Sequence, residues 1–323
     1  MKKRLGVAVA TALLWVWATS AAHAWISLGS GDKPKLEIET RFMFWGVDFG
    51  RDLAAPGTEE QTEDVQDIFI RRARLLARYR PTDTLELGLQ IGQDNWGTKV
   101  VSDDTGFKIK DFFVNWKARE YFQAVAGQFK VPFLRSNLQS GFNQLLVDRS
   151  VVTAIRPARE GSRDIGVMAW GNAGSLQYRA ALFDGSDQED LNSESSPRGS
   201  GRIAWNWGAR ERGYSYTGTS IGKDKVLQVS LQGDLQDDRA DPLDLGFTTQ
   251  LRDYGAWALD AYLDLPFCKK WAVTAEGAWI ERRDDYQDPA LGGSQHRRVL
   301  RAGRAPAADG DEGHAPAARR PAG

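Results

Sequence analysis

The sequence has one cysteine and almost no histidine, which removes most familiar catalytic chemistry. Cys268 cannot form a disulfide within the chain. The histidines are His23, His296 and His314, so residues 25–295 contain none. A Ser-His-Asp triad, a Cys-His pair or a His-ligated zinc site therefore cannot be built in the body of the chain. An enzyme that uses carboxylates alone remains an alternative, and no cofactor or metal site is predicted.

The sequence also lacks a hydrophobic run long enough to cross a membrane as a helix. Such a helix needs about 20 apolar residues, whereas the longest apolar run, at 5–18, is shorter. This run follows three positive residues at 2–4 and precedes the Ala-His-Ala sequence at 22–24. The order is typical of a secretory signal peptide. We predict that residues 1–24 are removed on export and that the mature chain begins at Trp25. An uncleaved anchor is the alternative.

The chain has no excess of positive charge. Its net charge is −1. Loss of the three basic residues at 2–4 leaves −4, and the segment from Arg297 to the end carries +3, so the region between them carries −7. Nucleic-acid binding favours a basic surface, so no nucleic-acid partner is predicted. The mean hydropathy of −0.46 resembles that of a soluble protein, but a membrane barrel hides its lipid-facing residues among polar ones.

What the sequence does contain is a repeated alternation of apolar and polar residues. In residues 35–44, Leu36, Ile38 and Phe42 share one face while charged residues occupy the other. Successive side chains of a strand point to opposite faces, so the pattern predicts strands with one apolar and one polar face. Eleven strands are predicted, at 35–48, 67–80, 84–94, 107–117, 121–131, 164–170, 175–184, 200–207, 225–236, 253–264 and 271–283.

The links between these strands alternate in length. Short links lie at 81–83, 118–120, 171–174 and 265–270, and long polar ones at 49–66, 95–106, 132–163, 185–199 and 237–252. Bacterial outer-membrane barrels combine short periplasmic turns with long outer loops in this way, whereas a soluble β-sandwich has no reason to sort its links. The link at 208–224 breaks the rule, because it should be short. The pattern predicts an all-β fold, a transmembrane antiparallel β-barrel.

The alternation stops near residue 290. Eleven is an odd strand number, whereas single-chain bacterial barrels have even numbers. The segment from Arg297 has no aromatic residue and is rich in Arg, Ala, Gly and Pro, so it cannot bury enough apolar surface to become ordered. We predict a signal peptide at 1–24, an incomplete barrel at 25–290, and a disordered, non-native tail at 291–323 that arises from truncation or a frame shift.

The most informative run for function is the arginine-rich segment 69–80. Phe69, Ala73, Leu75, Ala77 and Tyr79 are predicted to face lipid, which places four arginines toward the lumen: Arg72, Arg74, Arg78 and Arg80. Arginine stays charged, and one guanidinium can bind two oxygens of a phosphate or carboxylate group at once. This column can therefore attract anions. The alternative is that the arginines only pair with acids on neighbouring strands. Arg71 falls on the lipid-facing parity, which indicates a rim position or a shift of register.

The long link 132–163 is predicted to fold into the barrel mouth. It carries five arginines, namely Arg135, Arg149, Arg156, Arg159 and Arg163, and apolar patches at 145–147 and 151–152. An apolar patch of this size is unfavourable in water. Folding inward buries the patch and brings the arginines to the narrowest part of the pore. A loop that caps the outside of the barrel is the alternative.

Several segments resemble the phosphate-selective porin O and P family: Ile109-Lys110-Asp111, Gly127-Gln128-Phe129-Lys130-Val131-Pro132-Phe133, Val147-Asp148-Arg149-Ser150 and Arg163-Asp164-Ile165-Gly166-Val167. The resemblance covers about residues 35–285. It implies a trimeric outer-membrane porin of about sixteen strands, of which about eleven are present here. It also implies that 132–163 is the constriction loop and that the arginine column, with Lys130, lines the anion path.

The leading functional hypothesis is passive diffusion of small solutes, with anions such as phosphate favoured and no catalysis. The alternatives are a general non-selective porin, a non-conducting fragment of one, and a carboxylate-only barrel enzyme in the outer membrane. The expected location is the bacterial outer membrane after removal of the signal peptide. The expected partners are outer-membrane lipid, small anionic solutes and, by resemblance, two further copies in a homotrimer.

Overall fold

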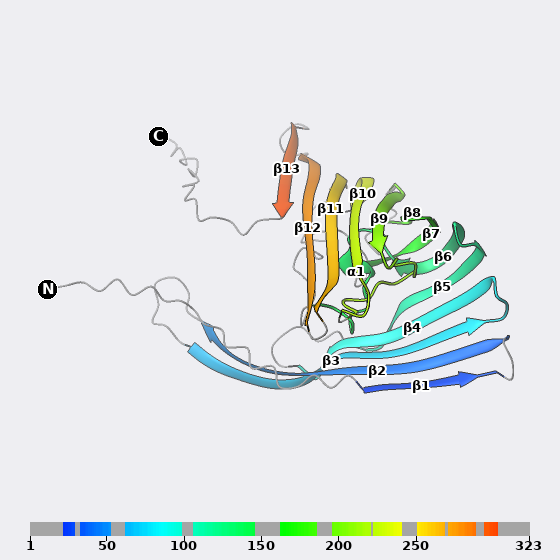
Figure 1. Cartoon of the computed structure of the whole chain (residues 1–323). Coiled ribbons are helices and arrows are strands. Elements are labelled where there is room, and N and C mark those ends of the chain that lie inside the picture. The colour runs from blue at the N-terminus through cyan, green and yellow to red at the C-terminus, as the bar shows by residue number, and fades with distance from the viewer. Residues whose placement is uncertain are drawn as a thin grey trace, which may run out of the picture.

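A computed structural model describes residues 22–29, 33–52, 62–98, 106–145, 162–185, 196–220, 222–240, 251–268, 271–288 and 294–302. Within these ranges, thirteen strands form one sheet in chain order, with β1 and β13 at its two edges. Each neighbouring pair is antiparallel. The sheet is strongly curved, and the short helix α1 (Arg135–Leu138) lies on its concave side (Figure 1).

The strands are β1 (Ala22–Leu28), β2 (Lys35–Asp52), β3 (Thr62–Arg80), β4 (Leu85–Trp96), β5 (Lys108–Arg119), β6 (Phe122–Lys130), β7 (Arg163–Ala173), β8 (Leu176–Phe183), β9 (Arg198–Gly208), β10 (Val226–Ala240), β11 (Leu251–Cys268), β12 (Trp271–Asp288) and β13 (Ser294–Ala302). All eleven predicted strands are present, as β2 to β12. The all-β prediction is thus confirmed, and the structure adds β1 and β13.

The two added strands lie at the ends of the sheet. β1 spans the predicted cleavage site and pairs with β2 from Ala22↔Phe42 to Leu28↔Leu36. β13 pairs with β12 from Ile280↔Ala302 to Asp288↔Ser294, so the prediction of disorder is wrong over this strand. Composition misled the prediction because an edge strand is paired through its backbone, which requires no apolar face. The remainder of the tail, from residue 303, lies outside the described residues.

The two faces of the sheet have the polarity of a membrane barrel. On β10, Gln228, Ser230 and Gln232 are buried on the concave side, while Leu231 and Leu235 are more than half exposed on the convex side. Polar side chains inside and apolar side chains outside are the reverse of a soluble sheet and match a strand whose outer face contacts lipid. Exposed aromatic residues collect near the short-turn ends of the strands: Trp116, Tyr121, Phe122, Trp205, Trp207 and Trp271.

A band of aromatic residues at one end of the strands is typical of the interface between membrane and water.

The helix α1 has four residues, and no helix in the described ranges combines the length and apolar character that crossing a membrane requires.

Two β-bulges change which residues face the concave side. Opposite β2, Met43 pairs with Arg72 and Phe44 pairs with Ile70, so Arg71 is an extra residue in β3. Arg71 and Arg72 therefore both face inward, and the parity reverses before them. Phe69 is 6% exposed and Ile68 is 81% exposed, which corrects the prediction that Phe69 faces lipid.

The second bulge lies in β5. Gln90 pairs with Asp111 and Ile91 pairs with Ile109, which leaves Lys110 as the extra residue. Lys110 and Asp111 are both buried on the concave side, while Ile109 and Phe112 on either side of them are exposed. A bulge of this kind redirects a side chain without ending the strand.

Candidate functional site

The concave side of the sheet contains a cavity of about 600 Å³, lined by β2 to β7, by residues 140–143 and by residues 214–217. Its described lining includes eight basic and four acidic side chains: Arg41, Arg71, Arg72, Arg74, Arg78, Lys110, Lys130 and Arg163 against Glu37, Glu39, Asp94 and Asp111. The cavity is therefore basic although the body of the chain carries −7.

Arg72 and Arg74 of the predicted column line this cavity and are nearly buried. The Arg74 guanidinium lies 2.5 Å from the Asp94 carboxylate and donates to the backbone oxygen of Gln93 at 2.9 Å. Its side chain occupies the space over Gly92, where an added Cβ would lie 2.4 Å from Arg74 Cδ. Arg72 donates to the backbone oxygen of Gly141 at 2.8 Å, which joins the column to the predicted constriction loop.

Arg78 and Arg80 lie nearer the short-turn end and pair with acids. Arg80 contacts Glu86 at 3.0 Å and Glu37 at 3.3 Å. Arg78 lies 3.5 Å from Glu86 and 3.7 Å from Glu37. Arg78 lines the cavity with its side chain half exposed, whereas Arg80 is not part of the lining. These cross-strand pairs are the geometry of the alternative interpretation, in which arginines stabilise the wall.

The opposite side of the cavity carries Lys130 and Arg163. Both are buried at neighbouring ends of β6 and β7, where they pair in register. Arg163 forms a bidentate ion pair with Asp111: Nε donates to Oδ1 at 2.9 Å and Nη2 donates to Oδ2 at 3.0 Å. Lys130 donates to the backbone oxygen of Gln139. Lys130, predicted on the anion path, and Arg163, predicted on the constriction loop, thus meet around the same cavity.

The first part of the predicted constriction loop folds against the inside of the wall. The backbone N–H groups of Leu134 and Arg135 donate to Gln232 Oε1 at 3.1 Å and Asp260 Oδ2 at 2.8 Å. The loop then passes along the cavity at residues 140–143. Arg135 itself is fully buried and does not line the cavity. The predicted loop residues Arg149, Arg156 and Arg159 lie outside the described residues.

The link between β9 and β10, the one that broke the alternation, also enters the concave side (Figure 1). It leaves the sheet at the short-turn end, and Tyr216 donates its backbone N–H to Leu138 of the constriction loop at 3.2 Å. Residues 214–217 face the same cavity as residues 140–143. Burial raises the pKa of the Tyr214 phenol, so this hydroxyl stays protonated.

The comparison with known protein families agrees with this geometry. The model of the family described as phosphate-selective porin O and P matches residues 45–261. The chain belongs to this family. No curated protein matches the chain. The porin is therefore an outer-membrane channel protein, in agreement with the inverted polarity of its sheet.

Three basic residues of the porin's cavity were not among the predicted lining residues, although a shift of register was one of the two interpretations of Arg71. Arg71 and Lys110 lie at the two β-bulges, where simple alternation assigns a side chain to the wrong face. Arg41, on β2, faces the cavity with regular alternation and pairs with Glu39 at 2.6 Å. The available signal was local: Ile109 and Phe112 are outward apolar residues three positions apart, where an unbroken strand requires an even spacing.

Proposed function

We propose that this porin conducts small anions, phosphate among them, through the cavity on the concave side of its sheet. The observation that carries the proposal is the sign of the lining. Eight basic and four acidic side chains give the cavity a net charge of +4, in a region of the chain that totals −7. Basic side chains thus outnumber acidic ones along the proposed path of the solute, whereas acidic side chains are in excess over the rest of the chain between residues 25 and 296.

The arrangement can attract anions without any chemical step. Fixed charges of one sign in a narrow space with low-dielectric walls raise the local concentration of counter-ions. The donors come from both sides of the cavity, with Arg72 and Arg74 on β3 and Lys130 and Arg163 at the ends of β6 and β7. Guanidinium groups can exchange a bound oxyanion between neighbours. The acids Asp94 and Asp111 offset part of the charge, which favours release as well as entry.

The proposal is tested with the purified full chain in planar lipid bilayers. The reversal potential in a potassium chloride gradient gives the sign of the selectivity, and we expect preference for chloride. Replacement of chloride by phosphate should preserve the anion preference, and added phosphate should reduce the chloride current by competition. A reversal potential near zero favours a general porin, and the absence of channels favours a non-conducting fragment.

The homotrimer and the contact with outer-membrane lipid also remain proposals. They rest on the family and on the apolar convex face. The mass of the protein in detergent, corrected for bound detergent, separates a trimer from a monomer.

A further inference from the structure

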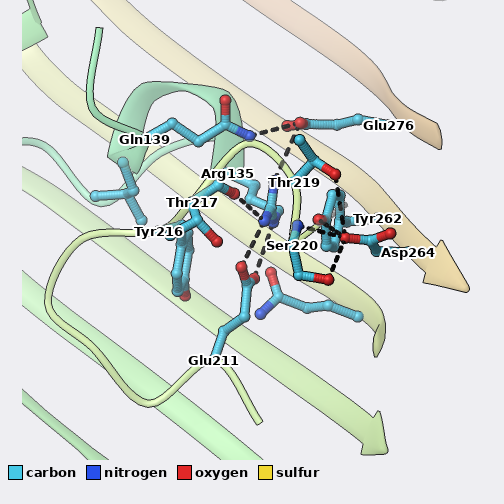
Figure 2. A network of polar contacts seen from close by, with 12 residues as sticks. Arg135, Gln139, Glu211, Tyr216, Thr217, Thr219, Ser220, Tyr262, Asp264 and Glu276 are labelled. Atoms are coloured by element: carbon cyan, nitrogen blue, oxygen red, sulfur yellow. Dashed lines mark hydrogen bonds and ion pairs between the residues drawn. The ribbon is translucent and has the colours of Figure 1, made fainter. Parts of the chain in front are cut away.

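Arg135 is fully buried, and it joins three separate parts of the molecule. Its guanidinium contacts Glu211 of the β9–β10 link at 2.5 and 2.9 Å and Glu276 of β12 at 3.1 Å. It also donates to the backbone oxygen of Thr217 at 2.7 Å. The ring of Tyr262 on β11 lies against the cation, 3.4 Å from Arg135 Cζ to the ring centroid. Figure 2 shows these groups converging on one side chain.

The link is fixed to the wall at a second point. Asp264 of β11 accepts from the Ser220 backbone N–H at 2.6 Å and from the Ser220 hydroxyl at 2.8 Å (Figure 2). Between Glu211 and Ser220, the link pairs with the constriction loop through the bridge between Gln139 and Tyr216. The two segments therefore lie side by side as one unit on the inside of the wall.

The charge arrangement makes Arg135 central to this unit. Glu211 and Glu276 both point at its guanidinium, and Gln139 Nε2 donates to Glu276 at 2.6 Å. Burial opposes the charge of Arg135, but the two carboxylates outweigh burial and raise its pKa above the usual value. Without the arginine, two carboxylates would face each other out of bulk water, which is strongly unfavourable. We call Arg135, Glu211 and Glu276 the Arg135 clamp.

The cavity lies on the other side of the same two segments. Residues 140–143, directly after the helix, and residues 214–217, inside the link, are both part of its lining. Any separation of the loop from the link changes the cavity wall at both places. Arg135 lies behind this wall and does not border the cavity.

We propose that Arg135 is a positioning residue for conduction: it clamps the constriction loop to the β9–β10 link and to the barrel wall, and so fixes the width of the anion path without touching the solute. This positioning role presupposes the proposed function, because it concerns the path through which the porin conducts anions. It assigns a role to the link, whose length the alternation of turns and loops does not explain.

The first test measures single-channel conductance and reversal potential for Arg135→Gln, Glu211→Gln and the double variant. We expect Arg135→Gln to give larger, noisier currents with weaker ion selectivity. The double variant should resemble it, because Arg135→Gln and Glu211→Gln each break the same ion pair. Arg212→Gln is the matched control: Arg212 lies in the same link and pairs with Glu120 at 2.5 Å on the exposed rim. Wild-type currents in folded clamp variants, or effects of the two changes that simply add, would overturn the proposal.

A second test does not depend on conduction. Asn143 lines the cavity, so Asn143→Cys in a Cys268→Ser background provides a single thiol in the constriction loop. Its reaction rate with a small water-soluble thiol reagent should rise when Arg135→Gln is added and stay constant with Arg212→Gln. Glu276→Gln, which removes the charge of one carboxylate and keeps the arginine paired with Glu211, serves if Arg135→Gln does not fold. An unchanged rate refutes the clamp even if the porin conducts anions, whereas an increased rate in a protein without anion preference refutes only the proposed function.

Discussion

The guanidinium of Arg71 lies over the indole ring of Trp45, with Arg71 Cζ 5.0 Å from the ring centroid. Arg71 also donates to Asn95 Oδ1 at 2.9 Å. Both contacts depend on the β-bulge, because an unbroken strand that keeps Arg72 inward would turn Arg71 toward lipid. The bulge thus adds a positive charge to the cavity. The negative face of the Trp45 ring stabilises this charge through a cation–π contact.

We expect Arg71→Gln to weaken anion preference without loss of folding. The change lowers the net charge of the cavity lining from +4 to +3, so the reversal potential should shift toward cations at low salt. Arg119→Gln is the control, since Arg119 is exposed at the short-turn end of β5 and outside the lining. An equal shift in both variants would show that the porin responds to its total charge and not to this position.

Gly92→Ala should destabilise the porin, because the new Cβ would lie 2.4 Å from Arg74 Cδ and 2.6 Å from the Ala73 backbone oxygen. Forced overpacking of this kind typically costs about 1–3 kcal/mol. Gly277→Ala on β12 is the control, since no atom of the described part of the chain lies within 4 Å of its added Cβ. Urea unfolding of the refolded protein in detergent compares the two. Equal midpoints would mean that the Arg74 side chain and the β3 backbone at Ala73 both move aside without cost.

The strands were predictable from the sequence because their alternation is a local property. Each of the eleven predicted segments forms a strand, since a sheet with one lipid face must repeat apolar residues with period two. The edge strands were not predictable by the same rule. β1 alternates through Ala24, Ile26 and Leu28 but lies across an apparent signal cleavage site, and the sequence of β13 is rich in arginine, so neither segment was predicted as a strand.

The cavity could be predicted only where alternation is unbroken. Arg72 and Arg74 lie on the concave side, where alternation places them, and their part in an anion path stays a prediction. The shift of register considered at Arg71 is the bulge in β3, whereas the bulge at Lys110 was not predicted. The partners of the arginines are set by the register between strands, which a single sequence does not contain. The role of Arg135 was beyond sequence reasoning for a further reason: its carboxylate partners lie 76 and 141 residues away along the chain.

Mass analysis of the protein from the outer membrane should give Trp25 as its first residue. The prediction rests on the positive, apolar and small-residue segments at the start of the chain. Removal of residues 22–24 shortens β1 but leaves Ile26↔Ile38 and Leu28↔Leu36 paired, so processing is compatible with the sheet. Retention of Met1 in membrane-inserted protein would contradict the prediction.

Truncation should distinguish β13 from the segment after it. Ending the chain at Asp288 removes β13 and with it the pairing from Ile280↔Ala302 to Asp288↔Ser294, so the sheet loses this set of backbone hydrogen bonds. We expect this variant to refold with lower yield and a lower urea midpoint. Ending the chain at Ala302 should change neither, because the sequence beyond lacks apolar groups that could pack. Equal behaviour of both variants would show that β13 does not contribute to stability.

The ion pair between Arg74 and Asp94 separates a conducting role of the arginine column from a structural one. Arg74→Gln lowers the net charge of the lining to +3 and leaves Asp94 with Lys110 at 3.7 Å, whereas Asp94→Asn raises the charge to +5. If the column guides anions, the two variants should shift the reversal potential in opposite directions, and the double variant should return close to the wild type. The shifts should shrink as salt rises, because the Debye length is about 10 Å at 0.1 M and about 3 Å at 1 M. If both single variants instead lower the refolding yield and leave selectivity unchanged, Arg74 serves to hold β3 against β4, and the anion path must depend on the other cations of the cavity.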